Sequence, residues 1–257
     1  MTSDAGKHAP TAIDLFSGLV LQAPLQRIVL PLFRQQHDAQ VRTTFEPTTI
    51  LVDLLRSGRH ADLIIAVRET LADLADEDLV AGGTMATIAV SGLGIAVPAG
   101  AEITPVDTVA AFTSLLTGAR SVAYSTAGAS GIYFAGLLNQ LGIRDRVDRT
   151  ATIVPQGYTG ERLLDGRADV AIQQLSELKS VPGITIAGPF PAAVQQYTAF
   201  AVAEVADPGR SAASRALVRS LHRLLASPEA REAYVKAGLE PGDPQTGSIP
   251  GSRNTGW

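Results

Sequence analysis

The stretch Asp62-Leu-Ile-Ile-Ala-Val67, followed directly by Arg68, decides how this chain folds. Its unbroken apolar run is typical of a parallel strand that is covered on both faces. Other short apolar runs alternate along the chain with segments of helical spacing, beginning with Ala12–Phe16 and Val41–Phe45 and ending with Tyr197–Ala203. This alternation predicts an α/β fold with parallel sheets and right-handed crossovers.

Two places interrupt otherwise regular elements. Apolar residues recur at helical spacing from Leu19 to Phe33, but Pro31 lies inside this segment. Because proline cannot donate a backbone hydrogen bond, we expect a kink or an early helix end there. Further along, Ser91-Gly92 separates Met85–Val90 from Leu93–Val97, which favours two strands over one.

Composition excludes several classes of function. The 257 residues contain no cysteine, which rules out disulfides, thiolate catalysis and cysteine-ligated zinc. A net charge of −4 without a long basic block argues against nucleic-acid binding. No stretch of about 18 apolar residues is present to insert into a membrane. We expect no metal site, since no two of the four histidines have a ligand spacing of three or four: His8, His37, His60 and His222.

The two ends of the chain predict flexible tails over residues 1–11 and 242–257. The second is rich in Gly, Pro, Ser and Thr, which is typical of disordered segments. The first lacks the apolar core of a secretory signal. This favours a cytoplasmic location. The alternative is a periplasmic location, with a leader that is missing from the sequence given.

Two turns that lead from a strand into a helix predict anion binding. Ser17-Gly18 forms the first, and the segment from Ser125 and Thr126 to Ser130 and Gly131 forms the second. Amides at a helix start have no partner within the helix and favour negative charge. Each turn alone could be a plain helix cap with Ser17 or Ser130 as a structural residue. Two such turns, one in each half of the chain, are more indicative of a shared site.

Other polar residues at strand ends could complete such a site. Arg68 follows the third predicted strand and could bind a carboxylate with two hydrogen bonds, or could pair with a neighbouring acid on the surface. Thr48 or Thr49 is expected to cap a short helix. Gln173 and Gln174 follow another strand and could hydrogen-bond a ligand or form a polar turn.

Three residues are candidates for proton transfer at the same site. Glu46 follows the second predicted strand and could act as a general base, although a solvated loop carboxylate is the simpler interpretation. Tyr133 and Tyr158 could donate or accept a proton, although packed tyrosines are more common. No histidine is placed to activate a serine, so a nucleophilic mechanism is not indicated.

An ordered series of segments resembles the molybdate-binding-protein-like group of type II periplasmic binding proteins. The resemblance implies two lobes, residues 12–91 with 199–241 and residues 92–198, and a ligand cleft between them that Ser17, Thr48, Arg68, the Ser125–Ser130 loop and Gln174 face. The segments that carry it are Ala61–Ile65, Gly94–Gly100, Ser121–Ser125, Ser130–Tyr133, Gln173–Leu178, Val181–Gly183, Gly188–Pro191 and Ser227–Ala230.

Two subgroups compete within this resemblance. The first comprises molybdate or tungstate carriers of ABC importers, whose paired serines after the first strand are here Ser17-Gly18. The second resembles aconitate isomerase, and the Ser121–Tyr133 tract is closer to it. The resemblance therefore implies a small di- or tricarboxylate ligand that is isomerised by an allylic proton shift without a metal or organic cofactor. The alternative is a non-catalytic receptor that delivers an anion to an ABC permease.

Overall fold

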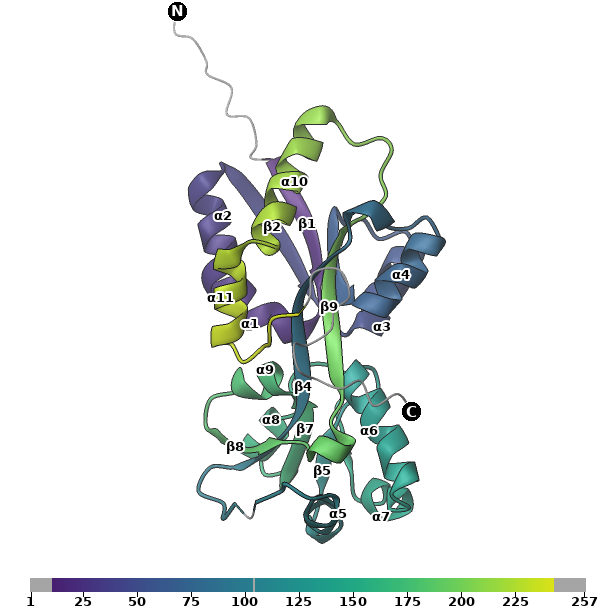
Figure 1. Cartoon of the computed structure of the whole chain (residues 1–257), viewed down its shortest axis with the longest axis vertical. Helices are drawn as coiled ribbons and strands as arrows, with labels where there is room; N and C mark the ends of the chain where they lie inside the picture. Colours follow the sequence, from purple (N-terminus) through teal and green to yellow (C-terminus); the bar gives the residue numbers. More distant parts are fainter. Residues whose placement is uncertain (1–10, 104, 243–257) are drawn as a thin grey trace, which may run out of the picture.

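The computed structural model of the chain describes residues 11–103 and 105–242. Figure 1 shows two lobes connected by the long strands β4 (Ala86–Pro98) and β9 (Tyr197–Glu204). The two-lobed α/β fold expected from the sequence is thereby confirmed. Of the two expected tails, only Thr11 and Gly242 belong to the described part of the chain. Thr11 is the first residue of β1. The other residues of both tails lie outside the described part. No helix among the described residues has the length and apolar character needed to cross a bilayer.

Lobe one is built on parallel strands. β1 pairs in parallel with β2 and β3, and β3 pairs antiparallel with β9. Its elements are β1 (Thr11–Ser17), η1 (Leu19–Leu21), α1 (Gln22–Pro24), η2 (Leu25–Val29), α2 (Leu30–Gln36), β2 (Ala39–Phe45), α3 (Thr48–Arg56), β3 (Leu63–Val67), α4 (Arg68–Asp76), η3 (Gly82–Thr84), α10 (Ala212–Leu225) and α11 (Pro228–Lys236).

The apolar run of β3 is buried on both faces, as its sequence predicts. Leu63 and Ile65 pack into the core under α2, α10 and α11. Ile64 and Ala66 point the other way, into the core under α3 and α4. All four side chains are fully buried. Successive side chains of a strand alternate between faces, so a strand between two helical layers must be apolar throughout.

Lobe two repeats this arrangement of helices on both faces of a sheet. One core lies under α5, α6 and α7, and the other lies under α8 and α9. β5 pairs in parallel with β6 and β7, and β4 pairs antiparallel with β7 and β8. Its further elements are α5 (Val109–Gly118), β5 (Val122–Tyr124), α6 (Ala129–Gln140), α7 (Arg144–Asp148), β6 (Thr152–Ile153), α8 (Glu161–Leu164), β7 (Val170–Gln174), α9 (Leu175–Lys179), β8 (Ile184–Pro189) and η4 (Ala192–Val194).

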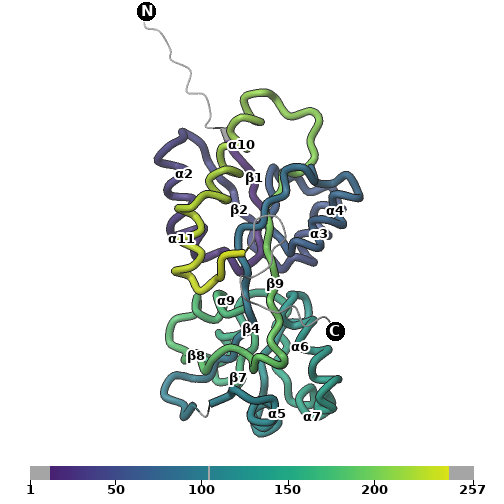
Figure 2. Tube along the Cα trace, viewed as in Figure 1, coloured from purple at the N-terminus to yellow at the C-terminus, as the bar shows by residue number. Residues whose placement is uncertain are grey.

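β4 is one unbroken strand, so the expected division into two strands at Ser91-Gly92 is wrong. Up to Gly92 the strand pairs with β9, and from Leu93 it pairs with β7. The backbone exchanges one partner strand for another at this point and needs no turn to satisfy its hydrogen bonds. Figure 2 shows the trace of β4 passing from one lobe into the other beside β9.

The first long helical segment does not end at Pro31, so of the two alternatives expected there the early helix end is wrong. The chain changes from π-type hydrogen bonding in η2 to α-helix at Leu30, and α2 continues to Gln36. Pro31 therefore falls in the first turn of α2, where a missing N–H is tolerated. The wider π turn that precedes it absorbs the proline, a common use of such turns.

Candidate functional site

The ends of strands from both lobes meet at one cavity. Its enclosed volume is about 30 Å³. Sites that bury an organic ligand usually enclose about 300–1,000 Å³, so this cavity is small by comparison. The lining comes from both lobes and consists of Gly18, Leu19, Val20, Pro47, Thr48, Ser125, Gly128, Ala129, Ser130, Gly157, Gln173, Gln174, Glu177 and Phe200.

Ser17-Gly18 forms part of the lobe-one wall, but not as a serine cap. The hydroxyl of Ser17 is fully buried and donates to the carbonyl oxygen of Gly18 at 3.1 Å, so the expected Ser17 cap is wrong. The amide of Gly18 donates to the carbonyl oxygen of Ile65 at 2.9 Å. Gly18 lines the cavity and Ser17 does not. Ser17 is the last residue of β1, and Gly18 takes the N-cap position of η1.

The start of α3 forms the second part of this wall. Pro47 is the N-cap residue, so neither Thr48 nor Thr49 caps the helix as expected. A cap needs extended backbone angles, and both threonines are already helical. The Thr48 hydroxyl accepts from the amide of Val67 at 3.3 Å and Thr48 lines the cavity. Thr49 instead donates to the carbonyl oxygen of Ala127 in lobe two at 2.8 Å.

The loop before α6 forms the lobe-two wall. The Ser125 hydroxyl accepts from the amides of Ala127 and Gly128 at 3.2 and 3.4 Å, which orders the loop. α6 begins at Ala129, with Gly128 as its N-cap. Ala129 and Ser130 therefore carry amides of the first helical turn, which lack partners within the helix, into the lining.

Two residues of this loop have different roles from those expected. Thr126 is exposed and lies outside the lining. Gly131 is buried, and a β-carbon built on it would lie 1.4 Å from the carbonyl oxygen of Ser125. Only glycine fits at this position, since any side chain would occupy the space of that backbone. Gly131 thus lets the loop fold closely against α6 and places Ser125 and Ser130 at the same cavity.

Gln173 and Gln174 both line the cavity, but their side chains already have partners. The Gln173 oxygen accepts from the amide of Thr159 at 2.7 Å, and its nitrogen donates to the carbonyl oxygen of Gly157 at 3.1 Å. The amide of Gln174 lies between Ser91 of β4 and Thr198 of β9. These two glutamines hold the 157–159 loop and the crossing strands in place around the cavity.

Glu177 is the residue that sequence reasoning missed. It lines the cavity, is 7% exposed, and its carboxylate accepts from the amide of Gln174 at 3.2 Å in a capping box. Burial raises the pKa of Glu177 from 4.5 to about 8, although hydrogen bonds from Gln174 and Gln173 lower it in part. Within the described lining it is the one ionisable side chain, and no Lys, Arg or His joins it there.

The three predicted proton carriers lie outside the lining. The Glu46 carboxylate accepts from Gln156 of lobe two at 3.2 Å. The Tyr133 hydroxyl donates to the carbonyl oxygen of Val194 at 3.0 Å, and burial raises its pKa.

Tyr158 follows Gly157 of the lining and donates to Gln22 of lobe one at 3.0 Å. Burial, and then the nearby Glu177, raise the pKa of Tyr158 to about 12. Its hydroxyl is therefore protonated over the whole neutral range and serves as a hydrogen-bond donor between the lobes.

Arg68 begins α4 and contacts its own lobe. Its guanidinium Nη1 donates to the Thr87 hydroxyl of β4 at 3.0 Å, and Arg68 is not part of the cavity lining. Its role in binding a carboxylate stays a prediction.

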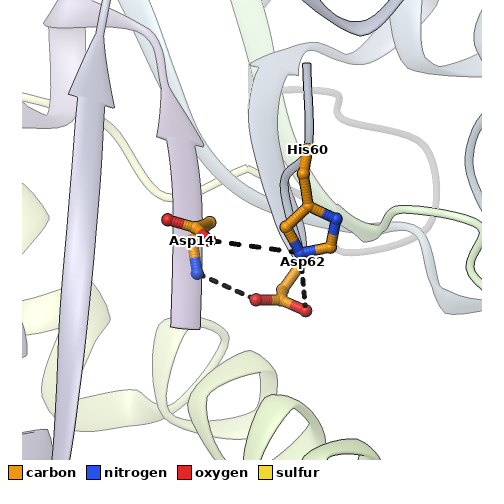
Figure 3. Close-up of side chains that lie close together, drawn as sticks. All are labelled: Asp14, His60 and Asp62. Atoms are coloured by element: carbon orange, nitrogen blue, oxygen red, sulfur yellow. Dashed lines mark hydrogen bonds and ion pairs between the residues drawn. The ribbon is translucent and has the colours of Figure 1, made fainter. Parts of the chain in front are cut away.

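A group of possible metal ligands lies elsewhere in lobe one. Asp14, His60 and Asp62 each place one donor atom within 4.8 Å of the others (Figure 3). Two arginines already balance the two carboxylates. Arg42 donates to Asp14 at 2.7 Å, and the buried Arg210 lies 3.2 Å from Asp62. The arrangement is that of an ion-pair network, and it is separate from the cavity lining.

The fold and the cavity define a class of protein that holds a small solute between two lobes. The family model for bacterial extracellular solute-binding proteins matches residues 13–240, and the chain belongs to this family. Among curated proteins, an aconitate isomerase of a Pseudomonas species is 34% identical over 191 residues, which are 73% of this chain and 70% of that protein.

Solved structures show the same fold. The periplasmic molybdate-binding protein of Azotobacter vinelandii superposes with a TM-score of 0.72 at 16% identity, over 90% of this chain and all of that one. The sulfate-binding protein of Mycobacterium tuberculosis superposes with a TM-score of 0.67 at 18% identity, over 91% of this chain and 88% of that one.

Proposed function

We propose that the protein binds a small di- or tricarboxylate between its lobes and isomerises it by an allylic proton shift. The identity to aconitate isomerase supports the choice of ligand and reaction. The observation that carries the proposal is the opening of α6 at Ala129 and Ser130 into a cavity whose opposite wall is formed by Gly18 and Thr48. Amides and hydroxyls from two lobes can surround an anion in this space.

The chemistry of such a shift needs stabilised negative charge more than it needs a cofactor. A base, for which Glu46, Tyr133 and Tyr158 stay the predicted candidates, takes a proton from the methylene carbon. A proton is then added at the far carbon of the double bond, so the double bond moves by one position. Between these steps the negative charge lies on the conjugated carboxylate. Fixed donors such as the amides of the first turn of α6 can stabilise this charge.

A non-catalytic receptor that passes its anion to an ABC permease is the second candidate function. Two observations favour it: the cavity is small, and its lining holds no cationic side chain among the described residues. A compact oxyanion can be held in such a site by neutral donors alone. The named ligands of the structural relatives, molybdate and sulfate, are anions of this kind.

A ligand screen followed by a reaction assay separates these functions. Thermal unfolding is measured with cis-aconitate, trans-aconitate, citrate, sulfate and molybdate. A ligand present at 100 times its Kd adds about 2.7 kcal/mol to the stability. We expect the largest shift with an aconitate, and proton NMR in deuterated buffer should then show interconversion of the two isomers with incorporation of deuterium. Stabilisation by molybdate or sulfate alone would show that the isomerase proposal is wrong.

A further inference from the structure

The protonation state of Glu177 affects whether the cavity can bind an anion. Its carboxyl group is buried in the wall of the cavity, and the described lining offers no cation to balance it. An ionised carboxylate at this place would repel an anion bound in the cavity. A protonated carboxyl has the opposite effect, because it can donate a hydrogen bond to the anion.

The surroundings of α9 keep this group isolated from other charges. The elements that pack most closely against α9 contain no ionisable side chain: η1, β4, β7 and β8. Tyr158 interacts electrostatically with this group from another segment, and its pKa of about 12 keeps it neutral. The cation Arg27 acts on Tyr158 in turn. On α9 itself, Lys179 lies against Gly238. Glu161 influences Tyr158 from the exposed side of α8.

We infer that Glu177 binds the anion in its protonated form, so that each anion enters the site together with one proton. The inference rests on the proposed anion binding but not on the isomerisation. Burial raises the pKa of Glu177 to about 8, and this value sets the pH range over which anion binding is coupled to proton uptake. Below about pH 7 the free protein already carries the proton. Above pH 8 the proton must be taken up from solvent when the anion binds.

The coupling also bears on the proposed reaction. A neutral carboxyl group next to the substrate can donate a hydrogen bond to the carboxylate on which charge develops. In this role Glu177 stabilises the charge and does not remove the carbon-bound proton. A receptor without catalysis would use the same hydrogen bond to bind its solute.

The test is calorimetry of trans-aconitate and of sulfate binding between pH 6 and pH 9.5, in pairs of buffers with different ionisation enthalpies. For the wild type we expect a constant Kd below about pH 7 and a Kd that rises by up to about tenfold per pH unit above pH 8. At pH 9 the dependence on the buffer should correspond to nearly one proton taken up per anion.

Two variants make the assignment specific. Glu177→Gln keeps an amide that can donate and still completes the capping box. It should bind at pH 6.5 within about threefold of the wild type and lose both the pH dependence and the proton uptake. Glu161→Gln removes an exposed carboxylate of α8 and should behave as the wild type does at every pH.

The outcomes separate the inference from the proposed function. Binding of an anion with a Kd independent of pH, or a Glu177→Gln protein that keeps the wild-type slope, overturns the inference alone. Binding of neither trans-aconitate nor sulfate at any pH overturns the proposed anion binding and the inference with it. Coupled binding of trans-aconitate without its isomerisation supports the inference and removes only the catalytic step.

Discussion

The hydroxyl of Thr49 donates a 2.8 Å hydrogen bond to the carbonyl oxygen of Ala127, which joins the start of α3 in lobe one to the loop before α6 in lobe two. Other hydrogen bonds cross the same gap. They run from Gln156 to Glu46, from Tyr158 to Gln22 and from the Ser176 hydroxyl to the carbonyl oxygen of Val20. Together these bonds hold the lobes in a closed arrangement around the cavity.

Loss of the Thr49 bond should shift the protein towards an open arrangement. Thr49→Val keeps the side-chain shape and removes the donor. Because a typical hydrogen bond contributes about 0.5–1.5 kcal/mol net, we expect trans-aconitate affinity to fall by about threefold to tenfold. Small-angle scattering of the free protein should show a larger radius of gyration.

Thr117→Val is the matched control for this change. The Thr117 hydroxyl donates to the carbonyl oxygen of Thr113 within α5, at 2.8 Å, and makes no contact between the lobes. It should leave both affinity and radius unchanged. Equal effects of the two substitutions would show that the Thr49 bond does not hold the lobes together.

Two glycines of α6 should respond in opposite ways to alanine. Gly131→Ala places a methyl group 1.4 Å from the carbonyl oxygen of Ser125, so the loop must move. We expect a loss of about 1–3 kcal/mol or more in the free energy of unfolding. Gly136→Ala meets no atom within 4 Å and should add about 0.5–1 kcal/mol, since alanine favours the helix. Urea unfolding measures both, and a neutral Gly131→Ala would show that the close approach is not needed.

Much of the fold could be predicted because burial leaves a pattern in the sequence. The apolar run of β3 signals two covered faces, and the cores on either side confirm it. Ser91-Gly92 wrongly predicts a break in β4 because the pair resembles a turn. A change of partner strand at this place depends on β7 and β9, which lie more than seventy residues further along the chain.

The site was harder to predict than the fold because side-chain direction decides it. Gly18, Thr48 and Ser130 reach the lining, while Thr126 lies on the outside of the same loop. Glu177 was missed because Gln174 and Glu177 look like part of a polar turn. Their spacing of three residues matches a capping box and could have indicated the short helix, but not its burial in the cavity wall.

The free energy of unfolding should decrease as the pH rises, because burial in the folded protein raises the pKa of Glu177. Its folded pKa of about 8 lies above the ordinary value of 4.5, so the folded state holds more protons between these values. This contribution to stability is complete below about pH 4.5 and is lost as the pH rises towards 8. The melting temperature of the wild type should therefore decrease relative to that of Glu177→Gln from pH 5 to pH 8, and the difference should level off above pH 8. If the melting temperatures of the two proteins changed in parallel with pH, the pKa of Glu177 would lie near its ordinary value.

Ser130 and Arg68 provide the sharpest test of which donors hold the anion. Ser130 is buried at the start of α6 and lines the cavity, so Ser130→Ala removes one donor without opening a space larger than an oxygen atom. A hydrogen bond to a charged group contributes about 1.5–3 kcal/mol, which predicts a loss of trans-aconitate affinity of about tenfold or more, with little change in stability.

If the guanidinium of Arg68 stays on Thr87 and outside the lining when ligand binds, Arg68→Ala should weaken binding by less than about threefold. Both variants are measured by calorimetry at pH 6.5, where Glu177 is protonated, so that the contributions of Ser130 and Arg68 to affinity are measured alone. The reverse order, with Arg68→Ala more than tenfold weaker and Ser130→Ala unchanged, would mean that Arg68 leaves Thr87 to bind the ligand. The carboxylate would then be held by a cation that enters the cleft when the lobes rearrange, and the neutral first turn of α6 would not be the anion site.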